Sequence, residues 1–295
     1  MQSSNDFYSQ LFALTQQKIC LIYSFALLPM AVQYSRNKNT TKGDCAMNTL
    51  LEAKDVTKIY GKSGYPSLDK VSFRVAEGEF IGIMGASGSG KTTLLNVLST
   101  IDTPTSGSIR INGVSLKNLN LAGAADFRRD HLGFIFQEYF LLDSLTIQEN
   151  ISVPLTLQKL PPDQIENMVR SLAERFGIAS QLGKYPHELS GGQRQRASAA
   201  RAIVKKPSIL FADEPTGALD SSSATELLNA LSEANRELHT TILMVTHDAY
   251  AASFADRILI FKDGRIIKEL INQGSSRRAF YESIAAEITR LDTAR

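Results

Sequence analysis

From residue 51 onward, short apolar runs alternate with longer segments of helical periodicity. Four runs are almost uniformly apolar, which is typical of strands that are buried on both faces of a parallel sheet. They read FIGIM at 80–84, LGFIF at 132–136, SILFA at 208–212 and TILMV at 241–245. Their alternation with helices predicts an α/β fold with a mainly parallel central sheet.

Other segments depart from this pattern in two ways. Leu51–Tyr60, Val71–Ala76 and Ser106–Asn112 alternate apolar and polar positions and are rich in turn residues, so they predict an antiparallel β flap. Between Glu138 and Tyr185 the strand signals disappear, and the segments TIQENISVPLTLQ and PPDQIENMVRSLAERFG have helical patterns. Prolines open the second of these and Gly177 closes it. We therefore expect an inserted α-helical subdomain at about 138–186.

The last segment, 273–295, is predicted to be a tail helix. Its sequence RRAFYESIAAEITRL places Tyr281, Ile284, Ile288 and Leu291 on one stripe. A stripe of this kind favours docking on the protein's own domain over binding of a partner helix.

The first 46 residues differ from the rest in composition. They contain both cysteines, Cys20 and Cys45, so the remaining chain has no disulfide framework and no thiolate metal site, as suits a reducing compartment. They also carry the whole net charge of +2, leaving 28 basic and 28 acidic residues in 47–295. Such a balance is unlike that of a nucleic-acid binder. The apolar run Ile19–Val32 is interrupted by Pro29 and is too short to span a bilayer.

A strand pattern begins directly after Met47. We therefore expect translation to start at Met47, with 1–46 a wrongly assigned extension; a disordered or membrane-touching tail is the alternative. N-terminal sequencing of the native protein tests this expectation, which a start at Met1 would refute.

A glycine-rich loop, GASGSGKTT at 85–93, follows the strand FIGIM and opens a helix. This setting is the one that a P-loop requires, because successive backbone N–H groups and the helix N-terminus then face one anion. A lysine in the loop reaches the β- and γ-phosphates, and the next hydroxyl binds Mg²⁺. A chance match in a chain of this length is on the order of 1%, given average glycine usage. The candidate nucleotide-binding residues are Gly85, Ser87, Gly88, Gly90, Lys91, Thr92 and Thr93, with Thr92 also a metal ligand.

Asp213 and Glu214 follow the buried strand SILFA. At a strand end behind a P-loop, Asp213 is placed to hold Mg²⁺ and Glu214 to act as general base toward the attacking water. No Asn-Lys-x-Asp element follows the P-loop, so adenine is favoured over guanine. The cofactors expected from these motifs are ATP and Mg²⁺.

A second anion-binding helix start lies at LSGGQ, 189–193, directly before the basic, alanine-rich run RQRASAARAIVKK. The expected frequency of this pentapeptide is well under roughly 0.1% from average residue usage. Its candidate ligand-binding residues are Ser190, Gly191, Gly192 and Gln193.

These three motifs together resemble the ATP-binding subunits of ABC transporters, and the resemblance covers about residues 50–270. It implies the fold of a P-loop NTPase of the ABC ATPase type, in a domain at 47–272. It also implies further roles: Tyr60 stacks on adenine, Gln137 senses Mg²⁺ and the attacking water, Asp220 links two sites across a dimer, and His247 contacts the γ-phosphate. Glu214, His247 and Gln137 are then the candidate catalytic residues, and Thr92, Gln137 and Asp213 the candidate metal ligands.

In this family two cassettes pair head to tail, so the resemblance implies a homodimer in which Ser190 and Gly192 complete the ATP site of the other copy. No membrane-spanning segment follows residue 47, which implies a separate integral-membrane permease and a location on the cytoplasmic face of the plasma membrane. The helical insert and the segment EYFLLDSLT, 138–146, would form the groove for that permease.

Longer stretches resemble the macrolide- and lipoprotein-exporter subgroup, and within it the bacitracin- and lantibiotic-detoxification transporters. They include NVLSTIDTPTSGSIRINGVSL, AYAASFADRILIFKDG and the tail SSRRAFYESI. One departure is Ala86, where proline is frequent. A regulatory ABC ATPase that acts on a membrane partner in cell-wall or cell-division control is the alternative. The sequence leaves open the cargo, its direction and any link through the permease to a sensor kinase.

Overall fold

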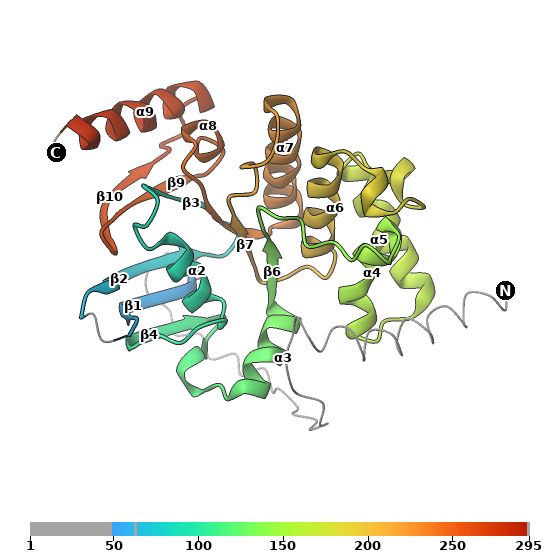
Figure 1. Cartoon of the computed structure of the whole chain (residues 1–295), viewed down its shortest axis with the longest axis horizontal. Helices are drawn as coiled ribbons and strands as arrows, with labels where there is room; N and C mark the ends of the chain where they lie inside the picture. Colours follow the sequence, from blue (N-terminus) through green and yellow to red (C-terminus); the bar gives the residue numbers. More distant parts are fainter. Residues whose placement is uncertain (1–48, 62–63, 294–295) are drawn as a thin grey trace, which may run out of the picture.

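The computed structural model describes residues 49–61 and 64–293, which form two β-sheets with helices around them (Figure 1). The expected start at Met47 and the extension 1–46 lie outside the described residues. One sheet is antiparallel, with strand order β2-β1-β4-β5. Its strands are β1 (Thr49–Ile59), β2 (Pro66–Ala76), β4 (Ser106–Ile111) and β5 (Val114–Ser115). The predicted antiparallel flap is confirmed, and β5 extends it.

The central sheet has six strands in the order β10-β9-β3-β8-β7-β6. Its strands are β3 (Phe80–Gly85), β6 (Leu132–Ile135), β7 (Ile209–Asp213), β8 (Thr241–Val245), β9 (Arg257–Lys262) and β10 (Arg265–Ile271). Every neighbouring pair is parallel except β9 and β10, which form an antiparallel hairpin at the edge. The mainly parallel sheet is as predicted, whereas the sequence interpretation did not assign the β9-β10 hairpin.

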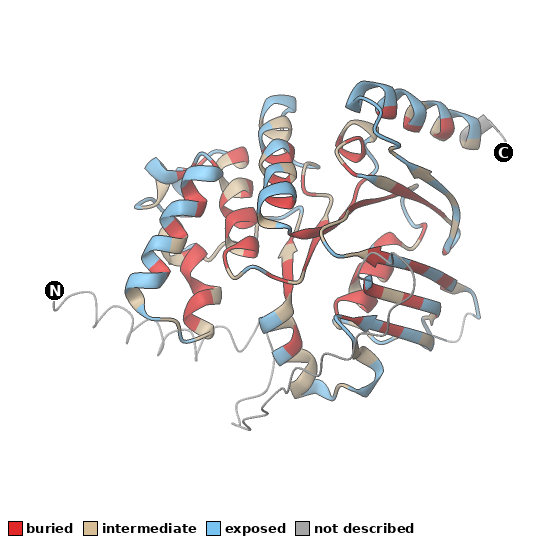
Figure 2. Cartoon of the chain, turned by 180° about the vertical axis from the view of Figure 1, so that it is seen from behind, coloured by how far each residue is buried: buried red, intermediate tan, exposed pale blue. Residues whose placement is uncertain are grey.

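Alternate side chains of the central strands enter two separate hydrophobic clusters. On β3, Ile81 and Ile83 pack with the flap and with α2 (Lys91–Leu98), whereas Phe80 and Met84 face the opposite side. On that side lie α6 (Gly191–Ile203), α7 (Ser221–Leu238) and α8 (Ala249–Ala252). Buried residues accordingly run along β3, β6, β7, β8 and β9, whereas the edge strand β10 carries none (Figure 2). This two-sided burial explains why the strand sequences are apolar at nearly every position.

The inserted helices are α4 (Ile147–Leu157) and α5 (Pro162–Arg175), and α3 (Leu121–His131) precedes β6. The helix α4 begins at a capping box, in which Thr146 and Glu149 each accept a hydrogen bond from the backbone N–H of the other. Pro162 stands in the first turn of α5, and Gly177, at φ +63°, follows its end. Both helices pack on α6, so the insert and α6 share one core.

The tail helix α9 (Arg277–Thr293) packs on α8, and the face turned toward the domain carries its buried residues (Figure 2). The predicted stripe was wrong at Tyr281, whose exposed fraction is 40%, because Phe280, at 3%, takes the inner position. Glu287 is also buried on this helix, and its carboxylate lies 2.6 Å from Lys268 Nζ on β10. Phe280, Ile284 and Glu287 then share one face.

Candidate functional site

The loop between β3 and α2 turns through two glycines with positive φ, Gly88 at +79° and Gly90 at +104°. A Cβ on Gly90 would lie 2.3 Å from the carbonyl oxygen of Ser67, so no other residue fits there. Among the described residues no side chain accepts a hydrogen bond from the first turn of α2. The Ser89 Oγ atom is buried and lacks a partner in this part of the chain. The helix N-terminus is therefore open to an anionic ligand.

Lys91 lies at the start of α2 and is buried, and its Nζ donates hydrogen bonds to the carbonyl oxygens of Gly85 and Ala86, both at 2.8 Å. Burial lowers the pKa of Lys91, while the carboxylates of Glu214 and Asp213 act in the opposite direction. The loop thus holds its lysine beside two acidic groups at the carboxyl ends of the central strands.

Asp213 is the last residue of β7, and Glu214 leaves the strand with φ +48°. The backbone N–H of Glu214 donates to the carbonyl oxygen of Val245, the last residue of β8, at 2.9 Å. Burial raises the pKa of Asp213, and the neighbouring Glu214 carboxylate raises it further, whereas Lys91 lowers it. The two acids therefore lie at one edge of the sheet, with Lys91 as a nearby cation.

Gln137 and His247 each follow a strand of this sheet, β6 and β8, by two residues. His247 Nδ1 lies 2.6 Å from Glu214 Oε2. Gln137 lies against the loop after Glu214, since a Cβ placed on Gly217 would be 3.2 Å from Gln137 Nε2. The structure thus brings together three residues that the sequence analysis placed in the catalytic set.

Tyr60 follows β1 in the flap, and its hydroxyl donates to Asp102 Oδ2 at 2.8 Å. The ammonium group of Lys58 lies 4.8 Å from the centre of its ring and also bonds Asp102 Oδ1 at 2.6 Å. The tyrosine is 45% exposed, so part of its ring is available for stacking. The sequence analysis did not identify Asp102 as the residue that holds Tyr60. The signal that could have identified it is its position in the loop TIDTPTSG, which follows α2.

The motif LSGGQ forms the start of α6. Ser190 is the N-cap: its Oγ accepts from the Gln193 N–H at 3.3 Å, and Gln193 Oε1 accepts from the Ser190 N–H at 3.0 Å. A Cβ on Gly191 would lie 3.0 Å from the Tyr139 hydroxyl, and one on Gly192 would lie 2.5 Å from Ser223 Oγ. Within one chain, the nearest neighbours of these glycines thus lie outside the P-loop at 85–93.

Asp220 is the N-cap of α7, and its Oδ1 accepts from the N–H groups of Ser222 and Ser223, each at 3.0 Å. The Ser223 hydroxyl donates to Oδ2 at 2.7 Å. Hydrogen bonds from Ser223 are the main reason why the pKa of Asp220 is lowered. Ser223 also approaches Gly192, so it connects Asp220 to the start of α6.

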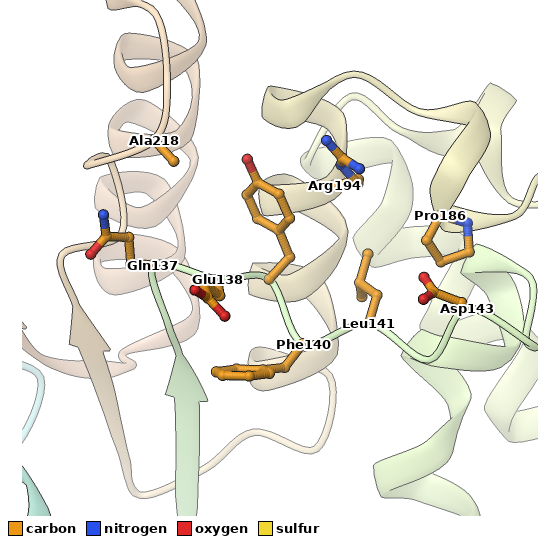
Figure 3. Close-up of a pocket in the computed structure, with 9 residues that line it drawn as sticks. Gln137, Glu138, Phe140, Leu141, Asp143, Pro186, Arg194 and Ala218 are labelled. Carbon is orange, nitrogen blue, oxygen red and sulfur yellow. The ribbon is translucent and has the colours of Figure 1, made fainter.

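A groove of about 510 Å³ lies between Gln137 and the helical insert (Figure 3). Arg194 of α6 lies over the ring of Tyr139, with its guanidinium carbon 5.0 Å from the ring centre. Arg201, further along α6, donates to the Tyr139 carbonyl oxygen at 3.0 Å. The groove is lined by Gln137, Glu138, Tyr139, Phe140, Leu141, Asp143, Pro186, Arg194 and Ala218.

The sheet order and the loop between β3 and α2 define a P-loop NTPase. More narrowly, the chain belongs to the ABC transporter family, whose model matches residues 68–217. It is an ATP-binding subunit and an ATPase. Among the helices described here, none combines the length and apolar character needed to cross a bilayer.

Two curated relatives are similar over most of their length. The bacitracin export ATP-binding protein BceA of Halalkalibacterium halodurans is 51% identical over 237 residues, 80% of this chain and 94% of that protein. The ABC transporter ATP-binding protein YxdL of Bacillus subtilis is 48% identical over 83% of this chain and 95% of its own length.

Solved structures of ABC cassettes have the same fold. The dimeric structure of MJ0796, described as a bacterial ABC transporter cassette, matches with a TM-score of 0.70 and 35% identity. The match covers 76% of this chain and all of the MJ0796 chain. A second structure of MJ0796 is described as a post-hydrolysis state bound to ADP and Pi. CbiO1 of Clostridium perfringens, part of the complex cbiONQ, matches with a TM-score of 0.72 and 28% identity over 83% of this chain and 95% of its own.

Proposed function

We propose that this ATPase powers a separate membrane permease that exports or detoxifies antimicrobial peptides of the bacitracin or lantibiotic kind. Similarity to BceA over nearly the whole length of that protein supports the cargo. The main support for ATP hydrolysis at this site is that Lys91, Glu214 and His247 lie together at one edge of the central sheet.

The loop at 85–93 binds the phosphates of ATP through its backbone N–H groups, Lys91 and the start of α2. The residues of this loop in contact with nucleotide are Gly85, Ser87, Gly88, Gly90, Lys91, Thr92 and Thr93. Tyr60, held by Asp102, stacks on the adenine ring. The open first turn of α2 and the part-exposed tyrosine ring support this placement.

The donor set of Thr92, Asp213 and Gln137 fits Mg²⁺, because a hydroxyl, a carboxylate and an amide oxygen are the hard ligands that this ion takes. When bound, the ion would neutralise charge on the β- and γ-phosphates. Burial of Asp213 supports this assignment, since a raised pKa marks a carboxylate that gains from a nearby cation.

Hydrolysis requires a base beside the attacking water, and Glu214 takes that role. His247 lies against Glu214 Oε2 and contacts the γ-phosphate, while Gln137 orients the water from the end of β6. Lys91 holds the phosphates during transfer. All four groups lie at the carboxyl ends of parallel strands, where α/β proteins place their ligands.

Two copies of the chain pair head to tail, so Ser190, Gly191, Gly192 and Gln193 of one copy complete the ATP site of the other. Within one chain these residues neighbour Tyr139 and Ser223 instead of the P-loop, which supports a role toward a partner. Asp220, joined to Gly192 through Ser223, links the two sites. The dimeric structure of MJ0796 supports the pairing of two cassettes.

The permease docks into the groove beside Gln137, which places the ATPase on the cytoplasmic face of the plasma membrane. Support comes from the groove itself, where Leu141 and Phe140 offer apolar surface between Glu138 and Asp143. Leu141→Asp is expected to abolish permease association while leaving the ATPase folded. Intact association in co-purification would contradict this docking site.

The experiment that tests the proposal is purification of the Glu214→Gln form from detergent-solubilised membranes of its native host, followed by mass spectrometry. A large multi-span permease with an extracellular domain is expected, and loss of this ATPase should increase sensitivity to bacitracin-like peptides. A cell-wall-hydrolase or division-site partner would overturn the transport assignment and favour the regulatory class. The Lys91→Ala form serves as the control that does not enter the ATP-bound state.

A further inference from the structure

One buried side-chain amide lies between the segments that carry Gln137 and Glu214. Gln195, on α6, has an exposed fraction of 0%. Its Nε2 donates to the carbonyl oxygen of Phe136 at 2.9 Å and to that of Pro215 at 2.7 Å. Phe136 directly precedes Gln137, and Pro215 directly follows Glu214.

These two hydrogen bonds occur where the sheet ladder stops. The strands β6 and β7 pair with each other in parallel up to Ile135 and Ala212, while β7 continues its pairing with β8 to Asp213. Beyond that point the β6–β7 ladder no longer joins the two segments to each other. The amide of Gln195 bridges the two exits at this point, so it fixes the backbone next to both candidate catalytic residues.

The orientation of the amide follows from its surroundings. Its Oε1 is buried and has no partner among the described residues, so the NH₂ group makes both bonds. The reverse orientation would turn the oxygen toward two carbonyl oxygens, which cannot donate. The function of the side chain is therefore that of a double donor to backbone.

Gln195 stands on the helix that Ser190 caps, one turn into α6. A helix moves as a rigid element over this length, so a shift of the Ser190 end reaches Phe136 and Pro215 through the same amide. We propose that Gln195 is a positioning residue, which holds Gln137 and Glu214 in register and couples their placement to occupation of the LSGGQ end. This inference rests on the proposed roles of Gln137 and Glu214.

The chain contains a matched control for this arrangement. Asn235, a buried amide on α7, donates through Nδ2 to the carbonyl oxygens of Gly78 and Thr240, at 2.8 and 2.9 Å. These carbonyls precede β3 and β8, at the amino ends of the strands. The two amides make the same bonds at opposite ends of the central sheet, and only Gln195 touches the segments of the candidate catalytic groups.

The test compares Gln195→Met with Asn235→Leu in the full chain, by melting temperature, ATP affinity and steady-state hydrolysis. Both substitutions remove a buried double donor, so both are expected to lower the melting temperature. Only Gln195→Met should lower kcat, by about tenfold to a hundredfold, with ATP affinity changed by less than about threefold. Should Gln195→Met fail to fold, Gln195→Ala replaces it, because alanine is a strong helix former and leaves room for water.

Unchanged kcat in the Gln195 variant, or an equal loss in the Asn235 variant, would overturn the inference. A Glu214→Gln control measured beside them separates it from the proposed function. If Glu214→Gln still hydrolyses ATP, the proposed catalytic base is wrong. If Glu214→Gln is inactive while Gln195→Met behaves like Asn235→Leu, the base stands and only the positioning role of Gln195 fails.

Discussion

His247 Nδ1 lies 2.6 Å from Glu214 Oε2, which joins the segment after β8 to the end of β7. A second bond, from the Glu214 N–H to the Val245 carbonyl at 2.9 Å, ties the same two segments through the backbone. Glu214 adopts φ +48°, a conformation that needs support from its surroundings in a residue other than glycine. Its carboxylate is therefore held in place at both backbone and side chain.

Replacing this held carboxylate by an amide tests its role as base. Glu214→Gln keeps the size of the side chain but cannot accept the proton of the attacking water, so hydrolysis is expected to fall by about a hundredfold or more. Because the phosphate loop is untouched, the variant should accumulate as an ATP-bound dimer. Size-exclusion chromatography with ATP and Mg²⁺ measures this state, and an elution as monomer only would refute it. Glu174→Gln, an exposed change on α5, is the control and should behave as wild type.

Removal of the loop lysine should act on binding instead of chemistry. Lys91 donates hydrogen bonds to the Gly85 and Ala86 carbonyls, so it is already held in the loop that we propose binds the phosphates. Lys91→Ala is expected to weaken ATP binding beyond detection at micromolar protein, as measured by calorimetry. Lys54→Ala, on the exposed face of β1, should retain wild-type affinity. Equal affinities for the two variants would contradict the phosphate-binding role.

The buried Asp213 carboxylate is expected to lower the free energy of unfolding, although it is proposed to bind Mg²⁺. Burial and the adjacent Glu214 raise its pKa in the folded chain, so its stability contribution is full below the unfolded pKa and is lost as the pH rises through the folded one. The ionised form of Asp213 therefore opposes folding. Asp213→Asn should raise the melting temperature without ligand and weaken the gain on adding ATP with Mg²⁺. A lower melting temperature of Asp213→Asn without ligand would show that the Asp213 charge does not destabilise the folded chain.

The sequence predicted those parts that depend on local pattern. Two-sided burial shows in the runs at 80–84 and 241–245, and the P-loop and LSGGQ are contiguous, so their placement follows from one strand or one helix. The Gln195 bridge could not be found in this way, because Phe136 and Pro215 are 59 and 20 residues away and meet it only in the folded chain. Periodicity also could not choose between Phe280 and Tyr281, since both lie one turn before Ile284.

That choice between the two aromatic residues predicts unequal costs for neighbouring substitutions. Phe280 is buried against the core, whereas Tyr281 is 40% exposed and lies outside the core cluster. Phe280→Ala is expected to lower the free energy of unfolding by about 3 kcal/mol, because it leaves a cavity, whereas Tyr281→Ala should change it by less than about 0.5 kcal/mol. Urea denaturation measures both. Similar losses of unfolding free energy in the two variants would show that Tyr281 also packs between α9 and the domain.

The ion pairs of the tail helix predict how its docking depends on pH. Hydrogen bonds from Arg290 and Lys268 lower the pKa of Glu287 to about 2, below the ordinary value of 4.5. Because the folded pKa is the lower one, the stabilisation by Glu287 is present above about pH 4.5 and is lost as the pH falls toward 2. Protection of the α9 amides against hydrogen exchange should therefore decrease over this interval. Glu287→Gln should show less protection at pH 7 and a flatter acid response, and a wild-type profile in this variant would contradict the assignment.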